Sequence, residues 1–150
     1  MRQLTLEWRT HFDAAHHHPG YDGPCAQMHG HRWEVLLILG PFSREHLDAQ
    51  GIAYDFRELK RGDAERVIQQ YDHKVLNDLL GNVPPSAENL ADRIFDDLTL
   101  AGVPVLVVKV YESPDAAAVA TERPGPPEPP TSEELTTALA LLARGARAAR

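Results

Sequence analysis

The chain is poor in thiols, in positive charge and in long apolar runs. It has one cysteine among 150 residues, which excludes an internal disulfide and suits a reducing compartment. It has 15 lysines and arginines against 22 aspartates and glutamates, so a net charge of −7 repels nucleic acid and anionic membranes. No apolar run approaches the roughly 20 residues that span a bilayer, and the first residues lack the apolar core of a signal peptide. We therefore expect a cytoplasmic protein with neither a nucleic-acid nor a membrane partner.

Histidine, by contrast, is concentrated around the one cysteine. The segment Cys25-Ala-Gln-Met-His29-Gly-His31 contains two histidines with one residue between them. Residues i and i+2 of a strand point to the same face, so His29 and His31 can bind one ion together. Three imidazoles and one open position are typical of a catalytic Zn²⁺ site. Spacing alone leaves the third ligand open among His11, His16, His17 and His18.

Cys25 allows two interpretations. It can serve as a fourth zinc ligand, which would close the site. Alternatively, it lies beside the ion as a thiol that the positive charge helps to deprotonate, and then acts as a base or nucleophile. The loop around it contains Pro19, Gly20, Gly23 and Pro24, and this flexible setting favours the second interpretation.

Hydrophobic periodicity predicts an α+β chain. Leu4, Leu6 and Trp8 alternate with polar residues, as in a half-buried strand. Asp55 and Ser86 are placed to cap two helices, the first of which Gly62 weakens in its middle. The expected elements are, in order, a strand over 4–14, a loop over 16–27, a strand over 29–39, a helix over 56–71, a helix over 87–101, a strand over 105–112 and a short strand over 116–121.

The composition changes beyond residue 120. Five prolines lie between positions 124 and 130, which favours an extended, semi-rigid linker. Thr131 and Glu134 form a capping box for a last helix that carries Leu135, Leu139 and Leu142 on one stripe. We expect a main domain over 1–120, a proline-rich linker over 121–131 and a helical appendage over 132–150.

Two further features are weak when taken alone. Asp72 and His73 form a carboxylate–imidazole pair, but we expect them at the end of the first helix, where neighbouring side chains diverge. Glu112 ends an apolar strand, where a carboxylate can accept two N–H groups from a guanidine-like heterocycle or simply face water.

Taken together, these pieces resemble the 6-pyruvoyl-tetrahydropterin synthase family over roughly residues 3–120. Six motifs occur in the family's order, which makes the resemblance far more specific than any one of them. The resemblance implies that His16 is the third zinc ligand. The motifs are Phe12-Asp-Ala-Ala-His16, Cys25-x3-His29-Gly-His31, Tyr54-Asp-Phe-Arg-Glu-Leu-Lys60, Asp72-His73-x2-Leu76-Asn77-Asp78, Pro85-Ser-Ala-Glu-Asn-Leu-Ala91 and Glu112.

The gap between thiol and His-Gly-His points to one branch of that family. Three residues, Ala26 to Met28, separate Cys25 from His29, as in the 6-carboxy-5,6,7,8-tetrahydropterin synthases of queuosine and deazapurine biosynthesis. This implies conversion of 7,8-dihydroneopterin triphosphate to 6-carboxy-5,6,7,8-tetrahydropterin, with release of acetaldehyde and triphosphate. The implied roles are Zn²⁺ binding by His16, His29 and His31, proton abstraction by Cys25, acid/base catalysis by Asp72 and His73, and pterin anchoring by Glu112.

The family also implies an architecture and an assembly. Its members adopt the tunnelling fold (T-fold), an antiparallel four-stranded sheet with two helices on one face, and form homohexamers with active sites at subunit interfaces. Here we expect an added C-terminal helix as well. The chain departs from the family pattern at His17 and His18, at Ser86 and at Ser113-Pro114, and its tail has no counterpart there.

The sequence leaves two alternatives open. The first keeps the pterin but changes the chemistry, to pyruvoyl-type elimination or to another cleavage of the pterin side chain. The second is a metal- or pterin-binding assembly module without turnover, in which the C-terminal helix docks a partner. Cys25, Asp72, His73 and Glu112 occur together, and this argues against a pure binder.

Overall fold

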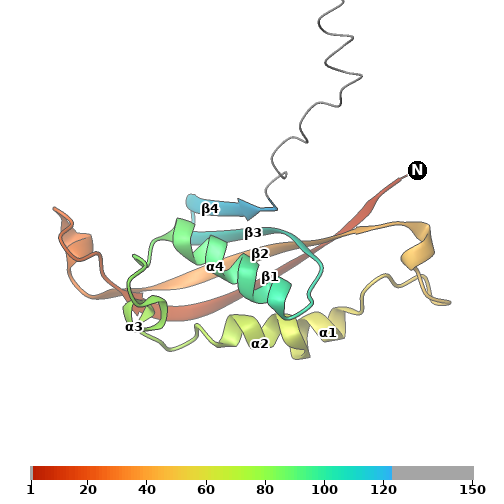
Figure 1. Cartoon of the computed structure of the whole chain (residues 1–150), viewed down its shortest axis with the longest axis horizontal. Helices are drawn as coiled ribbons and strands as arrows, with labels where there is room; N and C mark the ends of the chain where they lie inside the picture. The colour runs from red at the N-terminus through yellow and green to blue at the C-terminus, as the bar shows by residue number, and fades with distance from the viewer. Residues whose placement is uncertain (1, 123–150) are drawn as a thin grey trace, which may run out of the picture.

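The computed structural model of the chain describes residues 2–122. A four-stranded antiparallel sheet, in the order β1-β2-β3-β4, carries helices on one face (Figure 1). This confirms the predicted α+β class. The elements are β1 (Leu4–His16), β2 (His29–Phe42), α1 (Phe56–Arg61), α2 (Asp63–Gln69), α3 (Leu76–Leu80), α4 (Ala87–Leu100), β3 (Val105–Ser113) and β4 (Ala116–Thr121), with short 3-10 turns η1 (Pro24–Ala26) and η2 (Arg44–His46).

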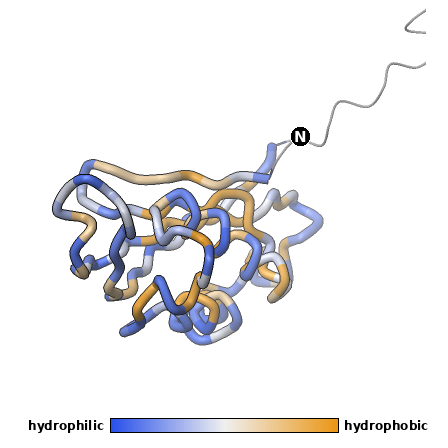
Figure 2. The backbone as a smooth tube through the Cα atoms, turned by 60° about the vertical axis from the view of Figure 1, so that its left-hand side comes forward, coloured by the Kyte–Doolittle hydropathy of each residue, from blue (hydrophilic) through white to orange (hydrophobic). Residues whose placement is uncertain are grey.

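The sheet forms because its strands alternate between an apolar and a polar face. Phe12 on β1 and Trp33 on β2 are fully buried, and their rings stack with centroids 6.2 Å apart. Short hydrophobic stretches, orange in Figure 2, alternate with hydrophilic ones along the backbone. The core therefore lies between the sheet and the helices. Its fully buried members include Leu37, Leu39, Leu59, Ile68, Leu90, Ile94, Leu98, Val108 and Val110.

The helix α4 follows its sequence signals closely. The Ser86 hydroxyl accepts a hydrogen bond from the backbone N–H of Asn89, which caps the first turn. Leu90, Ile94 and Leu98 recur every four residues and are all buried. The helix ends just before Gly102, whose φ of 77° is accessible to glycine at little cost.

The predicted helix over 56–71 is instead two short helices. Gly62 separates α1 from α2, and a Cβ atom at this position would lie 2.5 Å from the Glu58 carbonyl oxygen. Any side chain at this position would clash with the preceding turn. The helix is therefore interrupted at Gly62, where the sequence predicted only a weak point. The described residues contain four α-helices where two were predicted. The first predicted helix is divided into α1 and α2, and α3 was not predicted.

This break changes the setting of Asp72 and His73. Helix α2 ends at Gln69, and the pair lies in a turn in which His73 has a φ of 55°. The following residues run beside β1, where the Ala15 N–H donates to the Lys74 carbonyl at 3.0 Å. The pair is therefore fixed against β1. We had predicted that it would lie at the end of a helix instead.

Thr121, the first residue of the linker predicted over 121–131, is instead the last residue of β4. Residues 123–131 of that linker and the predicted C-terminal helix over 132–150 lie outside the described residues, so those predictions stay untested. None of the helices within residues 2–122 combines the length and the apolar character needed to cross a membrane.

Candidate metal centre and active site

Four side chains converge at one end of the sheet, on its helix-covered face. They are His16, His29, His31 and Glu112, and their ligand atoms all lie within 4.8 Å of one another. The strand register produces this group, because His16 is paired directly with His29 across β1 and β2. His31 follows on the same face two residues later. The polar side chains of the site thus lie on the same face of the sheet as the apolar core residues.

The three imidazoles surround one point. Their ring centroids lie 4.5 Å (His16–His29), 4.8 Å (His29–His31) and 5.1 Å (His16–His31) apart. Trp33 forms the floor beneath them, with its ring 4.9 Å from His16 and 5.2 Å from His31. The rigid indole therefore limits how far these two imidazoles can turn.

Backbone carbonyls orient two of the rings. His16 Nδ1 lies 2.7 Å from the Pro85 carbonyl, and His29 Nδ1 lies 2.8 Å from the Gln27 carbonyl. A carbonyl oxygen only accepts, so Nδ1 carries the proton in each ring and the Nε2 lone pair is left free. Hydrogen bonds of this kind fix the tautomer and orientation of metal-binding histidines.

Burial keeps two of these imidazoles neutral. It lowers the pKa of His16, whose side chain is fully buried, and also that of His31, against the opposing attraction of the Glu112 carboxylate. A neutral imidazole has its lone pair available, so an ion displaces fewer protons when it binds.

The donor set fits a divalent metal ion, and Zn²⁺ in particular. Three imidazole nitrogens and one carboxylate oxygen match the ligand types that zinc prefers. His16 Nε2 and His31 Nε2 are buried and have no hydrogen-bond partner among residues 2–122. An ion between the rings would satisfy both of these otherwise unpaired atoms.

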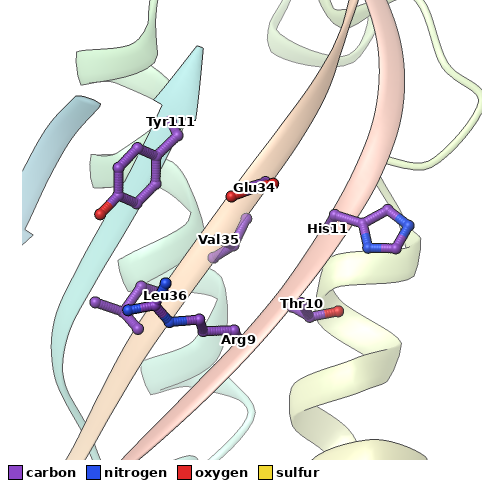
Figure 3. Close-up of a pocket in the computed structure, with 7 residues that line it drawn as sticks. All are labelled: Arg9, Thr10, His11, Glu34, Val35, Leu36 and Tyr111. Atoms are coloured by element: carbon purple, nitrogen blue, oxygen red, sulfur yellow. The ribbon is translucent and has the colours of Figure 1, made fainter. Parts of the chain in front are cut away.

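The other candidate histidines lie outside this group. Among residues 2–122, the buried His17 Nδ1 has no hydrogen-bond partner. The Asn77 side chain holds the His17 backbone, accepting from its N–H at 3.0 Å and donating to its carbonyl at 2.9 Å. His18 packs edge-on against His16, with ring centroids 5.1 Å apart. His11 lies on the helix-free face, where Figure 3 shows it beside Thr10.

Cys25 lies in the loop between β1 and β2, but it is not one of the four converging groups. It lies on the 3-10 turn η1 and is partly exposed. Its carbonyl accepts a hydrogen bond from the His18 N–H at 2.8 Å, which ties its loop to the end of β1. This arrangement leaves the thiol free for chemistry.

Asp72 and His73 form a tightly held pair. Asp72 Oδ2 lies 2.6 Å from His73 Nδ1, and Asp72 Oδ1 accepts the backbone N–H of Asp13 at 2.8 Å. That N–H and the neighbouring imidazole hold the pKa of Asp72 below its usual range, so the carboxylate is ionised at neutral pH. The turn brings the adjacent side chains together in a way that a helix would not. His73 itself is largely exposed.

Two hollows flank the histidines. One of about 340 Å³ is bordered by His31, Glu112, Tyr111 and Pro114. The other, of about 470 Å³, is bordered by His31 and His73, so His73 and one member of the metal group share a hollow. A third, of about 350 Å³, lies on the helix-free face and includes none of the metal group (Figure 3).

Sequence reasoning missed the groups that support the site. Trp33 could have been found, since it follows His31 by two residues on the same strand face. The carbonyls of Pro85 and Gln27 and the backbone N–H of Asp13 could not, because main-chain groups carry no sequence signal.

Several known proteins are similar to this chain in sequence or in fold. A sequence model described as 6-pyruvoyl tetrahydropterin synthase matches residues 5–123. A Synechocystis protein named 6-carboxy-5,6,7,8-tetrahydropterin synthase is 36% identical over 109 residues, covering 71% of this chain and 84% of that protein. An Archaeoglobus fulgidus protein that bears the same name provisionally is 35% identical over 113 residues, covering 75% of this chain and 91% of that protein. The structure of Caenorhabditis elegans 6-pyruvoyl tetrahydropterin synthase superposes with a TM-score of 0.68 at 22% identity, over 82% of this chain and 98% of that one.

Proposed function

The chain belongs to the 6-pyruvoyl tetrahydropterin synthase family, and from that premise we propose that it is a zinc-dependent 6-carboxy-5,6,7,8-tetrahydropterin synthase. With one water as co-reactant, it converts 7,8-dihydroneopterin triphosphate to 6-carboxy-5,6,7,8-tetrahydropterin and releases acetaldehyde and triphosphate. The observation that carries the proposal is the convergence of His16, His29, His31 and Glu112 beside a hollow of about 340 Å³. The names of the two curated relatives support the choice of reaction.

His16, His29 and His31 would hold the ion, with their Nε2 lone pairs freed by the carbonyl contacts described above. When bound, Zn²⁺ supplies Lewis acidity toward the vicinal hydroxyls of the substrate side chain. The protein supplies the orientation of the ligands, through the Pro85 and Gln27 carbonyls. Glu112 accepts paired N–H groups from the 2-aminopyrimidinone edge of the pterin, in a charge-assisted contact that fixes the substrate.

Proton transfers fall to two different groups. Cys25, as a thiolate, removes a proton from the substrate side chain. His73 moves a second proton at its exposed ring, while Asp72 orients the imidazole and stabilises its charged form. The hydrogen bond from Asp13 keeps Asp72 ionised and in place for that task.

We further propose that the active form is a cytoplasmic homohexamer, in the queuosine or a related deazapurine pathway. Cys25 and the Asp72–His73 pair occupy separate segments, and His73 is largely exposed. A neighbouring subunit that covers these side chains would complete a closed site, as in the interface sites that the family resemblance implies.

Two other functions are weaker candidates. Pyruvoyl-type elimination would use the same metal, base and pterin anchor, so only its products distinguish it. A binding module without turnover would need the pocket and the metal ligands, but it would have no use for the hydrogen-bonded Asp72–His73 pair. Turnover by the wild-type protein excludes the second candidate.

Single alanine variants of three consecutive histidines test the metal site and the activity together. We expect His16→Ala to lose both zinc and the release of triphosphate from dihydroneopterin triphosphate. His17→Ala and His18→Ala should keep zinc, because neither side chain belongs to the converging group. Zinc content is measured by atomic absorption beside turnover. Equal loss of zinc in all three variants would refute the ligand set, and a zinc-loaded wild type that releases no triphosphate would refute the lyase.

A further inference from the structure

We propose that Asn77 is a positioning residue for Cys25, because its side chain holds the end of β1 and, through it, the loop that carries the thiol. Asn77 belongs to the motif that begins with Asp72 and His73, but the proposed function uses only those two residues. The effect of Asn77 on turnover rests on the proposed function, in which Cys25 removes a proton from the substrate. Its hold on the loop does not.

The segment over residues 72–77 lies along the outer edge of β1. This strand is the first in the sheet order, so the edge that faces away from β2 has no neighbour within the sheet. Asp13 donates its N–H to the Asp72 side chain at 2.8 Å, and Ala15 donates its N–H to the Lys74 carbonyl at 3.0 Å. Alternate residues of the strand are thus paired with this segment, and α3 follows beside the end of β1 (Figure 1).

Asn77 takes the place of a main chain at the next position along this edge. Its Oδ1 accepts the N–H of His17 at 3.0 Å, and its Nδ2 donates to the His17 carbonyl at 2.9 Å. One amide side chain therefore pairs with both main-chain groups of one residue, as a neighbouring strand does. Asn77 lies in the first turn of α3, which the buried Leu76 and Leu80 anchor in the core. These two hydrogen bonds are called the Asn77 clamp.

The loop that follows has little else to hold it. None of the residues 17–28 is buried, so packing against the core contributes little to the position of this loop. Within residues 2–122, the Asn77 clamp supplies the only hydrogen bonds that reach the main chain of the loop from outside residues 16–29. The clamp is therefore the main restraint on where the loop lies.

One further hydrogen bond connects the clamp to the thiol. The His18 N–H donates to the Cys25 carbonyl at 2.8 Å, and His18 directly follows the clamped residue. Fixing His17 thus fixes the donor that holds the 3-10 turn η1, on which Cys25 lies. Without the clamp, the thiol is free to shift from its place, and a displacement of about 1 Å is enough to slow a reaction about 10²-fold.

Hydrogen exchange tests the clamp without any substrate. Asn77→Ala removes both hydrogen bonds, whereas Asn77→Asp keeps the shape of the side chain but turns a second acceptor toward the His17 carbonyl, which repels it. We expect the amides within residues 17–26 of the zinc-loaded protein to exchange about tenfold faster in both variants, with those of α4 unchanged. Mass spectrometry of peptic fragments measures both regions.

The matched control is Asn82→Asp, which makes the same change at an exposed residue of the next loop. It should exchange as wild type does. If Asn77→Asp also exchanges as wild type does, the side chain supplies shape rather than hydrogen bonds, and the proposal is overturned.

Turnover tests the positioning of the thiol. We expect Asn77→Asp to lower kcat about 10- to 100-fold, while KM and zinc content stay near those of wild type. Zinc stays because His16 is held separately, by the Pro85 carbonyl and by its pairing with His29. Asn82→Asp should keep the wild-type kcat.

Two results would overturn the role in positioning. One is a faster exchange of the loop with an unchanged kcat, which would show that the clamp does not place the base. The other is a loss of zinc from Asn77→Asp, which would show that the residue supports the metal ligand instead. If wild type does not turn over dihydroneopterin triphosphate, the proposed function fails together with the effect on turnover, whereas hydrogen exchange still decides the clamp.

Discussion

Replacing Cys25 with alanine is expected to lower the turnover of dihydroneopterin triphosphate by about 10²- to 10⁴-fold, while zinc stays bound. The loss follows from removing the one thiol that the chain can use as a base. Zinc stays because Cys25 is not one of the four groups whose ligand atoms converge. Turnover is measured as triphosphate release, and zinc content by atomic absorption on the same samples.

The control for this variant comes from the same loop. Met28 is 53% exposed and lies three residues after Cys25, so Met28→Ala perturbs the segment without touching the thiol. We expect it to turn over close to the wild-type rate. If Cys25→Ala keeps both zinc and full turnover, the base is another group. If it loses zinc instead, Cys25 is a ligand, which is the alternative that the sequence left open.

Asp72→Asn is expected to lower kcat by about 10²-fold or more, with little change in KM. Asparagine keeps the shape of the side chain and can still accept the Asp13 N–H. It loses the negative charge that orients His73 across the 2.6 Å contact and stabilises the imidazolium. A role in positioning the acid therefore predicts a loss in the rate of chemistry rather than in binding.

The double variant separates this role from a structural one. Asp72→Asn combined with His73→Asn should cost about as much as His73→Asn alone, since residues that act as a unit are not additive. Asp78→Asn, a carboxylate outside this pair, serves as the control and should leave kcat unchanged. Additive losses, or an Asp72→Asn variant that melts far below wild type, would show that Asp72 supports the turn rather than the proton transfer.

Local sequence rules predicted the parts of this site that lie on strands. The period of two in β1 and β2 was enough to place His29 and His31 on one face, and the resemblance to a family supplied His16. The antiparallel register then pairs His16 with His29. The Ser86 cap and the apolar stripe of α4 were equally readable, because their signals come from neighbouring residues.

The other features of the site depend on contacts between residues that lie far apart in the sequence. Asp72 and His73 were expected on a helix, but Gly62 ends α1 and the chain then turns to run beside β1. The hydrogen bond from Asp13 that holds Asp72 joins residues 59 positions apart, so no local pattern announces it. The approach of Glu112 to the histidines likewise needs the pairing of β2 with β3.

The products formed from 7,8-dihydroneopterin triphosphate test the central claim most directly. The purified, zinc-loaded protein is incubated with this substrate, triphosphate and acetaldehyde are quantified, and the pterin product is identified by its mass. We predict that acetaldehyde and triphosphate appear in equal amounts, together with 6-carboxy-5,6,7,8-tetrahydropterin. Release of triphosphate without acetaldehyde would contradict the account and identify a pyruvoyl-type elimination in its place.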